Sequence, residues 1–467
     1  MRPGSRRLQQ ELESLAETKL ERYVHDNLNR FAKDVARLAS QPSVSARKEG
    51  IEECAILVEK MMREVGIQTR VLRGAEGVAP LLYGEMKGSD SNKTILFYNH
   101  YDVQPEEPLD LWKSPPFKPE FREGRLYGRG VSDDKGELVS RLKLLESYLK
   151  VNGEPPCNVK FCFEGEEEVG SVHLDDYVSQ NHELFRADAV FWEWGGVDDQ
   201  GRPIVGLGVK GMIYLELVLK SLSIDAHSSY AAALPSAPWR LIRALNLIKD
   251  EDERVSVPGW YDKVENLTEE EERVLEEEPF DGESFKRYYG AQSFVGGITA
   301  SQARKALARR PTANIAGIWA GYTGPGSKTV LPKEIHCKMD LRLVPMQDPD
   351  ELLGRLRDFL KEKGFGDVSV EVETMEPAAR TNFRDPFAQA SIRSGESVFG
   401  KKSVVRLSEP GTGPLYVFTQ RYKIPAVSIG VSPPDNAIHA PNESIRLDLF
   451  EKGILWLAES TRTYLAG

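Results

Sequence analysis

TILFYNHYDV, residues Thr94–Val103, is an apolar run that ends in polar side chains, as is typical of a buried strand. Two later segments have the same form, NVKFCFEGEEE (Asn158–Glu168) and ADAVFWEW (Ala187–Trp194), and the helical segment Gly136–Val151 separates the first two strands. Strands that alternate with helices predict an α/β domain with a mostly parallel sheet flanked by helices. Such sheets bind ligands at the carboxyl ends of their strands, where these three segments carry a histidine and acids.

The pattern of elements changes near Met212. Alternating strands follow, beginning with MIYLELVLKS, and amphipathic helices are predicted at Ala237–Asp250 and Asp350–Gly364. Buried-strand segments return after Asp385. We therefore expect a catalytic α/β domain formed by residues 1–211 and 381–467. An inserted α+β lid or dimerisation domain, residues 212–380, interrupts it. A helix is also predicted before the first strand, from Gln9 to Leu38.

The composition argues against some classes of function, including nucleic-acid binding and membrane-spanning proteins. The 467 residues are 40% hydrophobic and 28% charged, as expected of a globular protein with a large core. The formal net charge of −11 argues against nucleic-acid binding, which needs clustered Lys and Arg. No apolar run approaches the roughly 20 residues that span a bilayer. The four cysteines form no zinc or redox motif, and no apolar signal core follows the first arginines, so we expect a cytoplasmic protein.

Histidine and carboxylate side chains recur at the strand ends, and these are ligands for metal ions. Two ions about 3.5–4 Å apart take a bridging carboxylate, and each also takes a histidine and a further carboxylate. His100 follows TILFYN, and Asp102 comes two residues later. A carboxylate there can bind the imidazole nitrogen that does not face the metal, which sets the tautomer. A purely structural histidine remains an alternative for this motif alone.

Two aspartates lie in a glycine-rich turn before the helix that begins near Gly136. Asp133 and Asp134 belong to LYGRGVSDDKGEL, where the glycines permit a tight bend and a close approach of the backbone to a ligand. Taken alone, adjacent aspartates before a helix are more commonly an N-cap. This turn therefore provides candidate ligands whose role depends on the other motifs.

Acidic residues end the next two strands. Glu166, Glu167 and Glu168 repel one another, which favours a bound cation about as strongly as a solvated loop. Glu193 lies between two tryptophans, where a charge is costly unless it is paired or bound to a metal. A loop after the apolar segment AVSIGV, NAIHAPNE, adds two more candidates, His439 and Glu443.

Five motifs, taken in chain order, resemble those of a metallopeptidase family. The family comprises carnosinase-like dipeptidases, aminoacylases, succinyl-diaminopimelate desuccinylase and related carboxypeptidases. The motifs are HYD, GRGVSDDKG, EGEEEVGS, WE and HAPNE. The resemblance extends from about Gln41 over nearly all of the remaining chain. Four further segments are most similar to the carnosinase-like branch: TEEE, GAQ, GPGSKTVLP and LRLVP. The resemblance implies a hydrolase that cleaves the amide bond of dipeptides or similar small peptides. Deacylation of N-acyl amino acids and carboxypeptidase activity are the alternatives, and a non-catalytic binding relative is a remote one.

The resemblance also implies a set of metal ligands. Two divalent ions are expected, zinc or manganese, with cobalt possible. Asp133 would bridge them and Asp134 would be its neighbour. Five residues would form the two positions, the first with His100, Asp133 and Glu193 and the second with Asp133, Glu168 and His439.

Two further roles follow from the same resemblance. Asp102 would orient His100, and Glu167 would be the general base that activates a water bridging the metals. Within the triple Glu, the Gly170–Ser171 pair that follows identifies Glu167 and Glu168 as the family's acidic pair, although Glu166 occupies a position that is usually apolar.

Substrate contacts are expected from the inserted domain and from the loop EPGTGP. The resemblance implies that His227 reaches the site of a partner subunit, so the chain would be a homodimer. Arg342 would bind a substrate carboxylate through its planar fork. Backbone N–H groups of Thr412 and Gly413 would serve the same end. Weaker candidates occupy matching strands and loops, namely Asn314 and Thr329.

The residues disfavour two other functions, nucleotide binding and phosphoester hydrolysis. GLGVKG (Gly206–Gly211) matches the dinucleotide fingerprint, but a strand pattern follows it, so it lacks the helix that a pyrophosphate needs. A dinuclear phosphoesterase would need more basic residues near the metals than this sequence contains.

Overall fold

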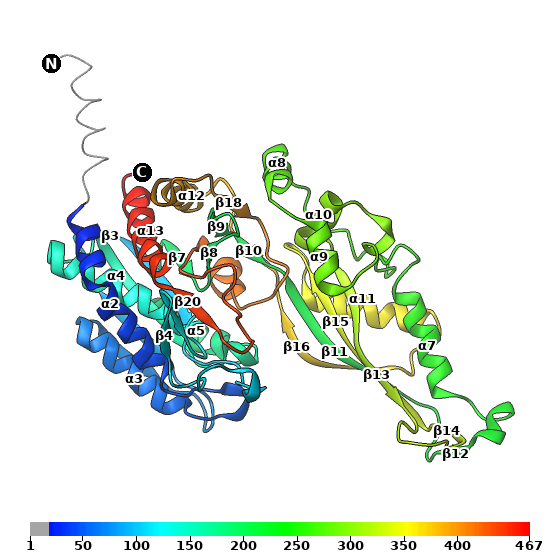
Figure 1. Cartoon of the computed structure of the whole chain (residues 1–467). Helices are drawn as coiled ribbons and strands as arrows, with labels where there is room; N and C mark the ends of the chain where they lie inside the picture. Colours follow the sequence, from blue (N-terminus) through cyan, green and yellow to red (C-terminus); the bar gives the residue numbers. More distant parts are fainter. Residues whose placement is uncertain (1–17) are drawn as a thin grey trace. The chain divides into compact units, whose positions relative to one another are not determined.

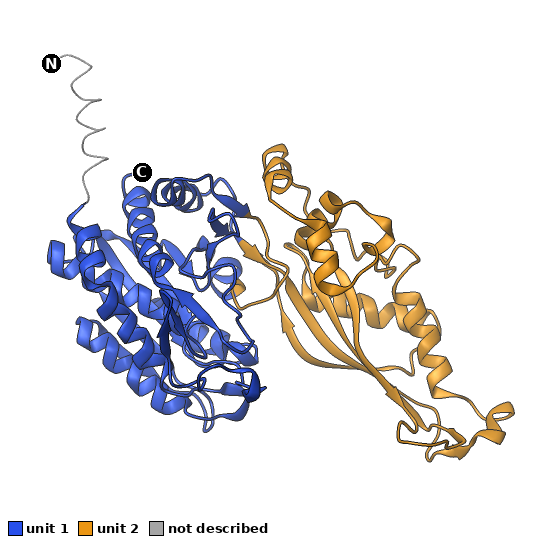
Figure 2. Ribbon diagram, in the orientation of Figure 1, with its two compact units in different colours: residues 1–207, 381–405, 417–467 blue, residues 208–380, 406–416 orange. Residues whose placement is uncertain are grey.

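The computed structural model describes residues 18–467. They divide into two compact units (Figure 2). Unit 1 comprises residues up to 207 together with 381–405 and 417–467, and unit 2 comprises 208–380 and 406–416. The sequence placed the first boundary at 211/212 and left 406–416 with the catalytic domain. In the structure the Lys210 N–H donates to the carbonyls of Glu409 and Gly411, which ties this segment to unit 2.

Unit 1 is built on a nine-stranded sheet (Figure 1). Its central strands run parallel, in the order β6, β3, β7 and β19, and antiparallel strands flank them. The predicted α/β class is therefore confirmed. The strands, in sheet order, are β1 (Gln68–Leu72), β2 (Leu81–Met86), β6 (Cys157–Glu164), β3 (Asp90–His100), β7 (Ala189–Trp192), β19 (Ala426–Ser428), β9 (Pro203–Gly206) and β18 (Val404–Arg406), with β8 (Gly196–Val197) paired to β9.

Helices cover this sheet. Helix α4 (Lys135–Asn152) packs against β3 and is itself covered by α2 (Lys19–Ala39) and α13 (Leu447–Leu465). It lies between these layers, and so it is buried along most of its length. Helix α3 (Ile51–Val65) packs against β1 and β2, and α12 (Pro386–Phe399) packs against β9 and β19. Helix α2 begins after a capping box at Thr18, and residues 9–17 of the helix predicted from Gln9 lie outside the described residues.

The sheet brings the candidate ligands to one edge. His100 is the last residue of β3, and Glu193 directly follows β7. The triple Glu begins two residues after β6, whose last residue pairs with His100. Since β3, β6 and β7 are parallel and adjacent, their carboxyl ends meet at the same place. Asp133 reaches this edge from the turn before α4.

Unit 2 contains a four-stranded antiparallel sheet in the order β13 (Thr312–Ala320), β15 (Glu334–Leu343), β11 (Gly211–Lys220) and β16 (Ser369–Glu376). Buried and half-buried residues alternate along β11 and β15, so one sheet face forms a core with α7 (Ala237–Ile248) and α11 (Pro349–Glu362). A second group of helices lies between residues 251 and 310, a segment rich in charged residues: α8 (Glu269–Glu277), α9 (Gly282–Tyr289) and α10 (Ala300–Arg309). Among residues 18–467, none of the helices combines the length and the apolar composition that a membrane span requires.

Candidate metal centre

His100 presents one imidazole nitrogen to a group of acids. The ring is almost fully buried. Its Nδ1 lies 3.1 Å from the carbonyl oxygen of Asp102 and 3.3 Å from the Asp102 carboxylate. Its Nε2 lies 3.1 Å from Asp133 Oδ1 and 3.8 Å from Glu193 Oε2. The contacts on Nδ1 orient the ring, so that Nε2 is the nitrogen available to a metal ion.

Asp133 lies between two histidines. Its Oδ1 is 3.1 Å from His100 Nε2, and its Oδ2 is 2.9 Å from His439 Nε2. Burial alone would raise the pKa of Asp133, yet the hydrogen bonds from His100 and His439 lower it below its ordinary value. The side chain is therefore held as a carboxylate that offers one oxygen to each side. This is the arrangement that a bridging ligand requires.

Two carboxylates at the site have buried oxygens that accept no hydrogen bond. Within the described part of the chain, neither Glu168 Oε1 nor Glu193 Oε2 has a hydrogen-bond partner. Glu168 Oε2 accepts a hydrogen bond from Gln104 Nε2 at 2.8 Å and lies 3.2 Å from His439 Nε2. Buried carboxylate oxygens without a donor are costly, and a cation is the partner that this cluster of acids fits. The donor set therefore suits divalent metal ions.

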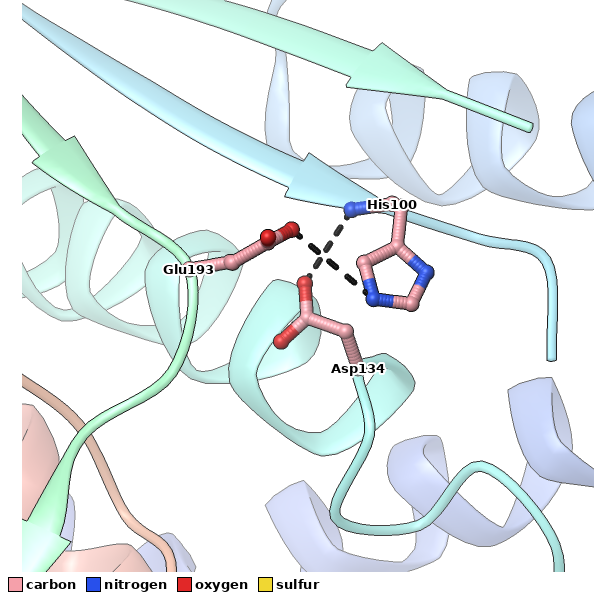
Figure 3. A group of neighbouring side chains, drawn as sticks. All are labelled: His100, Asp134 and Glu193. Atoms are coloured by element: carbon pink, nitrogen blue, oxygen red, sulfur yellow. Dashed lines mark hydrogen bonds and ion pairs between the residues drawn. The ribbon is translucent and has the colours of Figure 1, made fainter. Parts of the chain in front are cut away.

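The neighbouring Asp134 is engaged differently. Its Oδ2 accepts a hydrogen bond from Asn99 Nδ2 at 2.8 Å. It also accepts one from the backbone N–H of His100 at 3.1 Å (Figure 3). His100, Asp134 and Glu193 do have ligand-type atoms within 4.8 Å of one another. Burial raises the pKa of Asp134 above its ordinary value, and its Oδ2 is already engaged by these two donors. These contacts favour a structural role for Asp134 and leave Asp133 as the candidate ligand.

The three adjacent glutamates point in different directions. Glu166 turns to the backbone N–H of Ala79, at 3.2 Å, and to His173 Nδ1, at 2.7 Å. Glu167 Oε2 instead lies 3.9 Å from His100 Nε2. Burial raises the pKa of Glu167 well above its ordinary value, which favours a group that takes up a proton. Glu168 faces His439, so these positions support the register implied by the sequence resemblance.

The Asp102 carboxylate contacts both His100 and the segment of the three glutamates. Asp102 is fully buried and accepts hydrogen bonds from the backbone N–H groups of Glu167, at 3.2 Å, and Glu168, at 3.0 Å. The same carboxylate lies against His100 Nδ1. The sequence predicted the contact of Asp102 with His100 but not its hydrogen bonds from Glu167 and Glu168. Gln104, which holds Glu168, was missed altogether, and no spacing rule marks it.

The six predicted substrate contacts all belong to unit 2. His227, in the two-residue strand β12 (Ala226–His227), is 3.3 Å from Thr329 Oγ1. Arg342 Nη1 donates a hydrogen bond to Thr412 Oγ1 at 2.7 Å. The structure thus brings these candidates together in two pairs. The remaining two are Asn314, which donates to Asp340 at 2.8 Å, and Gly413, which follows Thr412.

Comparisons with known proteins cover most of the chain. The sequence profile of peptidase family M20/M25/M40 matches residues 96–463. The Cys-Gly metallodipeptidase dug1 of Schizosaccharomyces pombe is 27% identical over 93% of this chain and 96% of its own length. The Beta-Ala-His dipeptidase of Homo sapiens is 28% identical over 79% of this chain and 74% of its own length. Among solved structures, the M20 family metallo-carboxypeptidase Sso-CP2 from Sulfolobus solfataricus has a TM-score of 0.87 and 36% identity, covering 94% of this chain and 99% of that one.

Proposed function

Because the chain belongs to peptidase family M20/M25/M40, we propose that its metal centre hydrolyses the peptide bond of dipeptides and similar small peptides. The observation that carries this proposal is the placement of Asp133 between His100 and His439, with Glu167 beside them. The names of two relatives, which specify Cys-Gly and Beta-Ala-His, support a dipeptide as substrate.

Five residues would hold two divalent ions. Zinc or manganese is proposed, with cobalt as a further possibility, because imidazole and carboxylate ligands suit all three. When bound, such ions polarise the scissile carbonyl and lower the pKa of water. The first position would comprise His100, Glu193 and Asp133, and the second Asp133, Glu168 and His439.

Side chains of the protein would then transfer the proton during hydrolysis. Glu167 would accept a proton from the attacking water and pass it to the departing amine. Its raised pKa makes the carboxylate a stronger base than an exposed glutamate. Asp102 would keep His100 in the tautomer that presents Nε2, and it would hold the backbone of Glu167 in place through the same carboxylate.

Substrate recognition is proposed for unit 2. Arg342 would bind the carboxylate of the substrate, and its hydrogen bond to Thr412 would limit the freedom of the guanidinium. His227 would stabilise the oxyanion that forms when water attacks the carbonyl, acting in the site of a partner subunit. The other candidates would add polar contacts: Asn314, Thr329 and Gly413.

A homodimer is proposed on the basis of exposed apolar side chains in unit 2. β13 is an edge strand of the four-stranded sheet, with Ile315, Ile318 and Trp319 exposed on it. Trp239 and Ile242 are exposed on α7. An edge strand with apolar side chains is suited to pairing with another strand, and a second copy of this chain is the proposed partner.

Replacing Ile318 with lysine is expected to weaken this dimer, because the two copies would place like charges along the paired edges. The dimer dissociation constant should rise by at least about tenfold, as measured by sedimentation equilibrium. Activity should fall as well, since His227 would no longer reach a partner. Ile56→Lys, at an exposed isoleucine of α3 in unit 1, is the matched control. A monomeric wild-type chain would rule out the dimer.

Carboxypeptidase activity is the second candidate function. The structure of the Sulfolobus solfataricus metallo-carboxypeptidase is 36% identical to this chain, which is more than the two dipeptidases share with it. A carboxypeptidase does not need the free amino group that a dipeptidase recognises. The two activities therefore differ in their response to a blocked amine.

A panel of related substrates separates these functions. After treatment with a chelator, the chain is assayed with zinc, manganese or cobalt on a dipeptide, its N-acetyl derivative, a tripeptide and an N-acetyl amino acid. A dipeptidase should prefer the free dipeptide to its acetylated form by about tenfold or more in kcat/KM. Similar rates on both indicate a carboxypeptidase, and cleavage of the N-acetyl amino acid alone indicates a deacylase. No hydrolysis with any of the metals contradicts an enzymatic function.

We also propose a cytoplasmic location. All four cysteines are buried and free, which is typical of proteins from reducing compartments.

A further inference from the structure

His439 belongs to a loop that needs an external support. Its side chain is 51% exposed, unlike the buried His100. Its φ of 56° lies in the left-handed region, as do those of Ala437 (54°) and Asn442 (66°). Residues with a side chain rarely adopt this conformation. Three such residues within six positions mean that local preferences alone do not maintain the loop.

Glu443 ends this loop and is fully buried. Its Oε2 accepts hydrogen bonds from Arg129 Nη1, at 2.7 Å, and from the Gly130 N–H, at 3.0 Å. Its Oε1 accepts hydrogen bonds from the N–H groups of Ser132 and Asp133, both at 2.9 Å. One carboxylate thus receives four hydrogen bonds, and all four donors belong to the segment that ends at the candidate bridging ligand.

These contacts join two ligand segments that are far apart in the chain. Glu443 and Asp133 are separated by 310 positions. A fifth hydrogen bond, from the Gly128 N–H to the backbone carbonyl of Glu443 at 3.0 Å, lies beside the four to the carboxylate. A buried carboxylate is costly unless donors surround it, so this arrangement strongly disfavours any shift between the segments. His439 lies only four residues before Glu443.

We propose that Glu443 is a positioning residue that holds the loop of His439 in register with Asp133 and thereby sets the metal affinity of the second position. The inference rests on the proposed dinuclear function. Replacing Glu443 should therefore lower the metal affinity of the second position and not that of the first, because other contacts hold the ligands of the first position. His100 is fixed by Asp102 and by β3, and Glu193 directly follows β7.

The test is the metal affinity of Glu443→Gln. A glutamine amide would direct N–H donors at either Gly130 and Arg129 or Ser132 and Asp133, leaving one pair without an acceptor. Calorimetric titration of the full chelator-treated chain with Mn²⁺ or Zn²⁺ should resolve two binding events in the wild type. In the variant, one of them should weaken by about 10- to 100-fold. The other should stay within about twofold.

The control is Glu146→Gln. Glu146 is a largely buried acid on α4 that pairs with Arg30 and Lys143 of the same unit, away from the metal ligands. This variant removes one carboxylate from unit 1, as Glu443→Gln does, and should leave both affinities unchanged. Glu443→Asp is a second test variant, because its shorter side chain keeps the charge but cannot reach all four donors. It should also weaken one binding event.

The measured metal affinities distinguish failure of the inference about Glu443 from failure of the proposed function. Unchanged affinities in folded Glu443 variants, or equal weakening of both events, overturn the inference and leave the proposed function intact. A wild-type chain that does not bind two ions contradicts the proposed function itself. If neither Glu443 variant folds, hydrogen exchange of the metal-free wild type decides. The amides of Gly130, Ser132 and Asp133 should be protected, and rapid exchange there would overturn the inference.

Discussion

Replacing Glu167 with glutamine is expected to lower kcat by about 10²- to 10⁴-fold while both metal ions remain bound. The amide has nearly the same shape but cannot accept a proton from water. Glu167 is not among the five proposed metal ligands, and its backbone N–H would still donate to Asp102. Release of the amine product gives kcat, and elemental analysis gives the metal content of the same sample.

Glu166→Gln is the matched control for this experiment. Glu166 contacts the N–H of Ala79 and the ring of His173, so its replacement should change kcat by less than about tenfold. The pair of variants also tests the register of the triple Glu. A large loss in Glu166→Gln with near-normal activity in Glu167→Gln would move the general base by one residue and contradict the mechanism proposed for Glu167.

Replacing Asp133 with asparagine is expected to remove both metal ions and reduce activity to background. The two oxygens of Asp133 face His100 and His439, so each metal position would lose a ligand and a negative charge. Mutation of groups that only support a ligand typically costs 10- to 100-fold in affinity, so loss of the shared ligand should cost at least about 100-fold at each position. Calorimetric titration and activity measured across metal concentrations check this result.

Asp134→Asn provides the comparison at the adjacent residue. Burial raises the pKa of Asp134, so the site disfavours its charged form, and a neutral amide of nearly the same shape should be tolerated there. The asparagine oxygen can still accept the hydrogen bonds from Asn99 and His100. Metal affinity should therefore fall much less than in Asp133→Asn. The opposite order would assign the bridging role to Asp134.

Local sequence patterns predicted the parallel sheet and the edge at which the acids gather. Apolar runs of strand length ended at His100, before Glu166 and at Glu193, and in the structure the ends of β3, β6 and β7 adjoin one another. Such patterns work because burial and the alternation of strands and helices are properties of neighbouring residues. The choice of ligands among these residues came from the resemblance to a family of metallopeptidases.

The partner of each polar side chain was decided only in the tertiary structure. Three consecutive glutamates are chemically alike, and it is the contact of Glu166 with Ala79 and His173 that separates it from Glu167 and Glu168.

The support of Asp133 by Glu443 likewise depends on segments 310 positions apart. The grouping of 406–416 with unit 2 depends on hydrogen bonds between strand ends and a distant loop. Hydrophobic periodicity is local, so the residue types at the carboxyl edge of the sheet could be predicted from the order of residues alone. Only the folded chain determined which oxygen faces which nitrogen, because hydrogen-bond geometry is set by residues that are distant in sequence.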